Sequence, residues 1–250
     1  MEKKNDTSFS RRKFLGTSAM AVAGLAFAPQ SFAAIKAAKP NSKFGGVQIG
    51  AITYSWRSMP STAEDILKYC LEAGISSIEL MGNVAEEYAG IPAAIPAPPR
   101  GTQMSDDENV AFQKKVEQRK NEQRDWRLSV SMDKYKALRK MFNNAGVNLH
   151  IVKFSPSNWS DEEIDYAFKA AKVLGAKGIT NEIGDEACQR LGKFEEKHGM
   201  YAIYHNHAQP GEPGFSFDKF LAYSPKNMLN FDAGHYFGAT GNHPNEIIER

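Results

Sequence analysis

Short apolar segments alternate with helical patterns along most of the sequence, and this alternation constrains the fold more than any other feature. The segments have the length and composition of buried strands, and a helical pattern follows each one before the next begins. The six predicted strands are residues 47–54, 75–80, 147–154, 178–183, 201–206 and 228–232. Such a series of βα units predicts a parallel sheet with right-handed crossovers.

The number of units determines which parallel fold we expect. A closed (β/α)8 TIM barrel has eight strands, whereas this sequence reaches Arg250 inside a sixth helix that begins near Pro244. We therefore interpret the chain as an α/β protein with a TIM barrel that is truncated after about six βα units. The alternative is a parallel sheet that stays open.

Serine residues followed three positions later by an acidic residue mark several predicted helix starts, because the two side chains can cap each other's backbone. Ser160 and Glu163 predict one such start, and Ser61 and Glu64 predict another. A charged, solvent-facing helix is expected over residues 105–127, after a proline-rich loop.

The first residues of the chain resemble a twin-arginine (Tat) export signal over residues 1–33. Arg11 and Arg12 follow a polar, basic start, and a weakly apolar run then leads to a small-x-small cleavage pattern. A membrane anchor is the alternative, but the apolar run is too short and too rich in Ala and Gly to span a bilayer. We therefore predict a periplasmic protein that uses the Tat export machinery and keeps no stable membrane anchor. Residues 34–44 are then a linker, and residues 45–250 form the barrel domain.

Composition narrows the classes of partner and site. Residues 1–33 carry five Lys or Arg and two Asp or Glu, so the formal net charge falls from +2 to −1 without them. A near-neutral protein gives no support for a nucleic acid partner. Cys70 and Cys188 show no C-x-x-C spacing, so we expect neither a disulfide framework nor a thiolate zinc site.

Two polar clusters lie at the ends of the last two predicted strands. His205 and His207 end the first, and Asp232 and His235 follow the second. Because alternate residues of a strand face the same side, His205 and His207 share a face. The carboxyl ends of barrel strands carry the catalytic residues in TIM barrel enzymes. Histidine occurs six times in the chain and three times in these clusters, so a metal or acid/base site is a better interpretation than a chance grouping of loop histidines.

These clusters resemble motifs of the sugar phosphate isomerase/epimerase superfamily, the xylose-isomerase-like TIM barrels, with a likeness that covers about residues 45–250. The matching motifs are Ile78-Glu79, His205-Asn206-His207 and Asp232-Ala233-Gly234-His235. More narrowly, the chain resembles an exported branch of this superfamily that is common in Bacteroidetes. The resemblance implies a periplasmic enzyme of carbohydrate metabolism that binds one divalent metal ion.

The resemblance also implies which residues bind that metal. Asp232 matches a ligand position, and His205 occupies a position at which many relatives carry Glu. Glu182, at the end of the neighbouring predicted strand, could restore a carboxylate to the site, and a solvated loop glutamate is the alternative interpretation. Imidazole ligands favour Mn, Zn, Co or Fe over Mg.

Sugar chemistry next to a carbonyl requires a base to remove a carbon-bound proton and an electrophile to stabilise the enediolate. Glu79, Lys153 and His207 are the candidate catalytic residues, and Lys153 could instead extend to solvent. Trp56 is a candidate for stacking on a sugar ring, although aromatic residues at such positions also serve as rim packing. His235 resembles a histidine of the family that contacts substrate or metal.

We therefore hypothesise a metal-dependent sugar isomerase or epimerase that acts on a keto-sugar or keto-glycoside. A 3-keto-glycoside lyase that acts by β-elimination is an alternative, because oxidised glycosides exist outside the cytoplasm whereas phosphorylated sugars are scarce there. A non-catalytic sugar-binding protein is a further alternative. In each case the partner is a small-molecule sugar.

Overall fold

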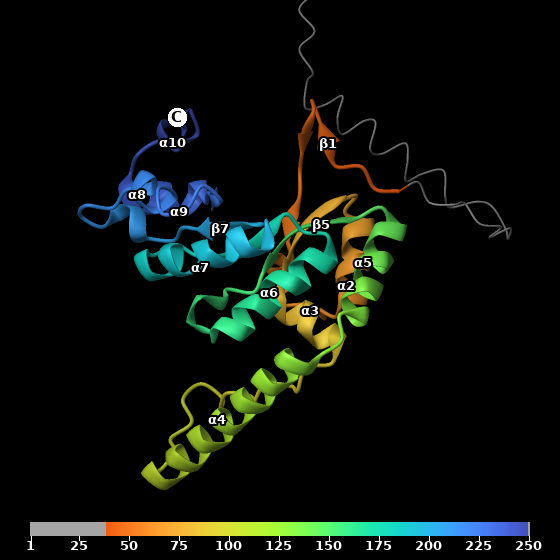
Figure 1. Ribbon diagram of the computed structural model, residues 1–250, viewed down its shortest axis with the longest axis vertical. Helices are drawn as coiled ribbons and strands as arrows, with labels where there is room; N and C mark the ends of the chain where they lie inside the picture. Colours follow the sequence, from red (N-terminus) through yellow and green to blue (C-terminus); the bar gives the residue numbers. More distant parts are fainter. Residues whose placement is uncertain (1–38, 250) are drawn as a thin grey trace, which may run out of the picture. The chain divides into compact units, whose positions relative to one another are not determined.

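The computed structural model describes residues 39–249, so the predicted export signal and the first part of the predicted linker lie outside the described residues. The described chain forms a parallel six-stranded sheet, in the order β3-β4-β5-β6-β7-β8, and a short antiparallel pair, β1-β2. The prediction of an α/β protein with six parallel strands is confirmed (Figure 1). The strands are β1 (Lys43–Phe44), β2 (Val47–Gln48), β3 (Ala51–Ile52), β4 (Ser77–Met81), β5 (Asn148–Lys153), β6 (Gly178–Glu182), β7 (Tyr201–His205) and β8 (Asn227–Asn230).

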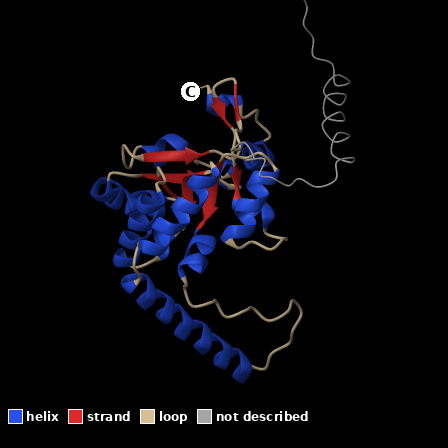
Figure 2. Ribbon diagram, turned by 90° about the vertical axis from the view of Figure 1, so that its right-hand side faces the viewer, coloured by secondary structure: helices blue, strands red, loops and turns tan. Residues whose placement is uncertain are grey.

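Helices connect the parallel strands and surround the sheet (Figure 2). The helices that follow β5 and β6 contact each other as well as the sheet. Among residues 39–249, no helix combines the length and the apolar character that crossing a bilayer requires. The α-helices are α2 (Ala63–Glu72), α3 (Gly82–Ala89), α4 (Asp106–Ser129), α5 (Asp133–Ala145), α6 (Asp161–Leu174), α7 (Asp185–His198), α8 (Phe217–Leu221), α9 (Ala233–Thr240) and α10 (Asn245–Ile248). Short 3-10 turns are η1 (Thr53–Trp56), η2 (Pro156–Asn158) and η3 (Gln209–Gly211).

The core lies between one face of the sheet and the helices. Strand alternation sends every second side chain toward the helices, where these side chains are removed from water. Removal of apolar surface from water stabilises a fold by roughly 25 cal/mol per Å². Fully buried members of this layer are Ile78, Leu80, Leu149, Ile179 and Tyr204 from the strands, with Ile66, Leu138, Phe142, Ile164, Phe168 and Leu174 from the helices. The other residues of the same strands are therefore directed to the opposite, inner face of the sheet.

The helix starts show how closely capping residues can be predicted. The pair Ser160 and Glu163 caps α6 as predicted. At α2 the prediction is wrong by one residue, because Thr62 rather than Ser61 accepts the backbone hydrogen bond, with Asp65 as its partner. A threonine and an aspartate supply the same hydrogen-bonding groups as the predicted pair.

Buried Glu195 of α7 gives the stability of the fold a predictable pH dependence. Its carboxyl is fully buried and accepts a 2.7 Å hydrogen bond from Ser224 Oγ. Burial raises the pKa of Glu195 from 4.5 to about 7. A raised folded-state pKa means that the folded chain holds this proton more tightly than the unfolded chain. The stabilisation is therefore complete below pH 4.5 and is lost as the pH rises through about 7.

We expect wild-type protein to lose on the order of 3 kcal/mol of stability between pH 4.5 and 7 relative to a Glu195→Gln variant, since each pKa unit corresponds to about 1.4 kcal/mol. Urea unfolding of both proteins across this range measures the difference. All other titrating groups are common to the two proteins, so they cancel. If the difference in unfolding free energy between wild type and Glu195→Gln stays constant from pH 4.5 to 7, the pKa of Glu195 is not raised.

Candidate active site at the carboxyl ends of the strands

The inner face of the sheet carries polar residues at the carboxyl ends of neighbouring strands. Lys153 ends β5, Glu182 ends β6 and His205 ends β7. Glu182 and His205 are paired in the parallel register, so their side chains lie next to each other on the same face. Three consecutive strands therefore deliver an amine, a carboxylate and an imidazole to one edge of the sheet.

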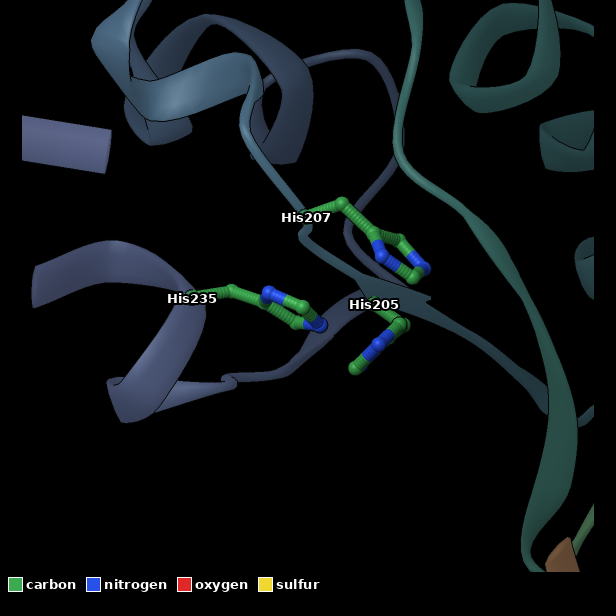
Figure 3. Close-up of side chains that lie close together, drawn as sticks. All are labelled: His205, His207 and His235. Atoms are coloured by element: carbon green, nitrogen blue, oxygen red, sulfur yellow. The ribbon is translucent and has the colours of Figure 1, made fainter. Parts of the chain in front are cut away.

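Two further imidazoles join His205 at this edge. His207 lies just beyond β7, and His235 lies in the first turn of α9. The ring centroids of His205 and His207 are 4.6 Å apart, as are those of His207 and His235. One ring nitrogen of each histidine can be chosen so that all three lie within 4.8 Å of one another. Figure 3 shows the three rings gathered around a common space. We call these three residues the imidazole cluster.

Asn206 fixes the two loops that carry the imidazole cluster. Its side chain is fully buried on the helix side of β7, opposite His205 and His207. The Asn206 amide accepts a hydrogen bond from the backbone N–H of Asp232 at 2.8 Å and donates one to the Asp232 carbonyl at 3.1 Å. This paired contact ties the end of β7 to the start of α9. Strand alternation places Asn206 on the face opposite His205 and His207. The sequence indicates no role for Asn206, because its partner is a backbone group from a distant segment.

Glu182 lies between Lys153 and the imidazole cluster. Its Oε1 atom accepts a 2.7 Å hydrogen bond from Lys153 Nζ, and its Oε2 atom is 3.0 Å from His207 Nε2. Oε2 is shielded from solvent and makes no hydrogen bond. The Lys153 side chain is 15% exposed, so the predicted solvent-facing alternative does not describe it. The site therefore holds a carboxylate with one oxygen tethered and the other facing an imidazole.

The pKa values of Asp232 and His205 are both lower than the ordinary values of these side chains. Partial burial works to raise the pKa of Asp232, but the 2.8 Å hydrogen bond from the His235 amide, the nearby imidazoles of His235 and His205 and the Gly234 amide together outweigh burial, so the pKa lies below its ordinary value. Burial lowers the pKa of His205, and the nearby Lys153 ammonium adds to this effect. An anionic Asp232 and a neutral His205 follow. Asp232 also caps α9 through Oδ1, a contact that the sequence did not indicate.

Two other predicted site residues, Glu79 and Trp56, make their contacts away from the imidazole cluster. Glu79 is deeper on the inner face, where it accepts hydrogen bonds from Thr180 Oγ1 at 2.7 Å and Asn230 Nδ2 at 2.9 Å. It also lines a cavity of about 340 Å³ beside His150. Trp56 packs against the ring of Tyr69 at 5.9 Å. Sequence reasoning missed Thr180 and Asn230, although both stand at inward positions of predicted strands.

The residues of this site fit a divalent metal ion. Neutral imidazole nitrogens are ligands for Zn, Co, Fe and Mn, and imidazole-rich sites disfavour Mg. The three histidines come from two segments, the end of β7 and the start of α9, which Asn206 ties together. The unbonded, shielded Oε2 atom of Glu182 gives the same space an anionic group. The donor set is therefore adequate for an ion, with Glu182 and Asp232 as the adjacent negative charges.

Comparisons with known proteins place the fold. No family model and no curated protein matches the sequence. A crystal structure of a sugar phosphate isomerase/epimerase from Parabacteroides distasonis matches with a TM-score of 0.52 and 16% identity, over 84% of this chain and 75% of that one. The chain shares that fold. The probable 3-DHS dehydratase AsbF of Bacillus anthracis, a protein involved in petrobactin synthesis, matches with a TM-score of 0.51 and 15% identity, over 81% of this chain and 69% of that one.

Proposed function

We propose that the chain is a divalent-metal-dependent enzyme that acts on a keto-sugar or keto-glycoside by removing a proton next to the carbonyl. The observation that carries this proposal is the convergence of the imidazole cluster with the Glu182 and Lys153 pair at the carboxyl ends of the strands. This edge is where enzymes with parallel α/β barrels carry out their chemistry. The names of the two similar structures, an isomerase/epimerase and a dehydratase, describe reactions that can share this first step.

The reaction begins when a basic side chain accepts the proton from the carbon beside the carbonyl. The electron pair of the broken C–H bond then moves to the carbonyl oxygen and forms an enediolate. A divalent ion in the imidazole cluster would polarise that carbonyl. Glu182 is the base in this proposal, because Lys153 holds only its Oε1 atom, and its Oε2 atom, 3.0 Å from His207 Nε2, keeps a lone pair that can accept a proton.

The product depends on how the enediolate collapses. Return of the proton to the other face of the same carbon gives an epimer, and return to the neighbouring carbon gives an isomer. Departure of a group on the next carbon gives a β-elimination, as in a 3-keto-glycoside lyase. Lys153, which donates a hydrogen bond to Glu182, keeps the carboxylate oriented through all three outcomes. The location that we propose is the periplasm, where keto-glycosides are available substrates.

Deuterium exchange measures the first step without knowledge of the product. Metal-loaded protein is incubated in D₂O with a panel of ketoses and 3-keto-glycosides, and the substrates are followed by proton NMR. We expect loss of the signal of the proton next to the carbonyl, or appearance of an elimination product. The parent glycosides, which lack the carbonyl, are the control. Binding of the keto compounds with neither exchange nor elimination would instead support the sugar-binding alternative.

A further inference from the structure

The imidazole cluster has the geometry of a complete set of protein ligands for one metal ion. We propose that His205, His207 and His235 together bind one divalent ion of the Zn²⁺, Co²⁺ or Fe²⁺ class, and that Glu182 and Asp232 stay outside its ligand set. This inference rests on the proposed function and deepens it, because it assigns the ligands and the metal class. It also differs from the set of Glu182, His205 and Asp232 that the sequence favours.

Distances support a shared ion. The three candidate nitrogens lie within 4.8 Å of one another. Two imidazole nitrogens that bind one ion at about 2.1 Å with tetrahedral geometry are about 3.4 Å apart. Rotation of the rings can close this gap, because the side chains of His207 and His235 are each about half exposed, at 48% and 49%. His205 provides the fixed point, since it belongs to β7 and is less exposed.

The second nitrogen of His207 already has a partner, which determines the nitrogen left for the metal. Nε2 of His207 faces Glu182 Oε2 at 3.0 Å. Its Nδ1 atom is therefore the one available to the other two rings, and Figure 3 shows the ring with one nitrogen turned toward them. A metal-bound histidine commonly donates its other N–H to a carboxylate, which fixes the tautomer. Glu182 stands where such a partner is needed.

Contacts that Glu182 and Asp232 already make keep their carboxylates out of the ligand set. Lys153 holds Glu182 Oε1 at 2.7 Å, so movement of Glu182 onto the ion would break a partly buried ion pair. Asp232 uses Oδ1 to cap α9 and leaves Oδ2 4.0 Å from His235 Nε2. Both anions are therefore placed beside ligand imidazoles, where they compensate the charge of the ion.

Three imidazole ligands also select the metal class. Late first-row divalent ions bind nitrogen donors more tightly than Mg²⁺ or Ca²⁺, which prefer oxygen. Three protein ligands leave a tetrahedral ion with one open position. A carbonyl oxygen of a substrate could take that position.

Metal titration tests this inference without a turnover assay. Untagged full-length protein is stripped with a chelator and titrated with Co²⁺, whose visible spectrum reports nitrogen ligation, and Zn²⁺ content is measured by elemental mass spectrometry. We expect one ion per chain. His205→Ala, His207→Ala and His235→Ala should each weaken Co²⁺ binding beyond the about 10–100-fold that loss of an outer partner costs.

Two matched variants serve as controls. His243→Ala removes an exposed histidine outside the cluster, and Asp232→Asn keeps a side chain that can still cap α9. His243→Ala should bind Co²⁺ like wild type, and Asp232→Asn should weaken Co²⁺ binding by no more than the about 10–100-fold that loss of an outer partner costs. Wild-type affinity in His207→Ala or His235→Ala would overturn the inference, and loss of binding in Asp232→Asn would restore the ligand set favoured by the sequence. The melting temperature of each stripped variant tests its fold, and Zn²⁺ should raise it only where the cluster is intact.

The outcomes separate the ligand assignment from the proposed function. Metal-dependent deuterium exchange, in a protein whose His207→Ala and His235→Ala variants bind the metal like wild type, would overturn the ligand assignment and leave the function. One bound ion per chain with the expected variant pattern, but no exchange on any keto compound, would leave the ligand assignment and overturn the function.

Discussion

Replacement of Glu182 by Gln is expected to lower turnover by about 10²–10⁴-fold, the usual contribution of a general base. Gln has nearly the same shape, and its carbonyl can still accept the hydrogen bond from Lys153 Nζ. What it loses is the ability to accept a proton. Because Glu182 lies outside the proposed ligand set, metal content should stay at the wild-type value. Initial rates at saturating keto-sugar and elemental analysis of the same samples measure both quantities.

The matched control for this variant is Glu186→Gln. Glu186 is an exposed carboxylate at the start of the following helix, α7, so the substitution changes the same charge outside the site. Its turnover should equal that of wild type. If Glu182→Gln also turns over at the wild-type rate, Glu182 is not the base. If it loses the metal as well, Glu182 is a ligand rather than a neighbour of the imidazoles.

The central part of the sheet could be predicted from the sequence because local signals there agree with the packing. The strands near His205 and Glu182 are apolar runs that end at polar residues. Helix α6 starts at a capping serine, and both α6 and α7 end at glycines. Alternation along β7 was then sufficient to place His205 and His207 on one face. Periodicity and capping are local properties, so a single sequence contains them.

The first strand was predicted too long because a turn just before it pairs its first residues with β1. Residues 47–54 were expected as one strand, but Gly45 and Gly46 both have positive φ and reverse the chain, so β2 pairs with β1. Only Ala51 and Ile52 remain in the parallel sheet. The exposed side chain of Val47, at 62%, shows that its apolar character does not serve the core.

The sequence analysis missed two helices, α3 and α9. The start of α3 lacks a capping residue, and the start of α9 resembles a turn. No side chain caps α3, which begins at Gly82 directly after β4. A side chain at Gly82 would collide with the Lys153 carbonyl, since a Cβ atom there would be 2.8 Å from that oxygen. Helix α9 begins at the motif that was interpreted as a strand end and turn, because Asp232 is its capping residue. In both places long-range packing determines the backbone.

The contacts among the site residues could not be predicted either, because they too depend on tertiary structure. The sequence selected Lys153, Glu182, His207 and His235 separately, but it gave no indication that Glu182 would lie between Lys153 and His207. These contacts join residues from three segments and depend on the stagger of β5, β6 and β7. The stagger of parallel strands is set by packing across the whole sheet.

The second large effect concerns Arg127, near the end of α4. Its guanidinium donates to Glu86 through Nε at 2.7 Å and Nη2 at 3.1 Å, and to Glu163 through Nη1 at 3.1 Å. It also stacks on the ring of Trp159 at 3.9 Å. Burial works to lower the pKa of Arg127, but its hydrogen bonds to the two carboxylates and their negative charges together outweigh burial and raise the pKa. The side chains of the three charged residues are only 8% to 12% exposed.

Arg127→Ala should therefore destabilise the protein by about 3–5 kcal/mol, because it leaves two buried carboxylates without their shared cation. Arg127→Lys keeps the charge but cannot form the two-pronged contact with Glu86, so we expect a smaller loss. Arg124→Ala, on the exposed side of the same helix, should stay within about 0.5 kcal/mol of wild type. Urea unfolding at constant pH measures the free energy of unfolding of the three variants.

If Arg127→Ala loses no more stability than Arg124→Ala, the charge network does not hold α4 to α3 and α6. A large loss would establish that this network, beside the packing of Trp126 on the core, holds a helix that has no fully buried residue.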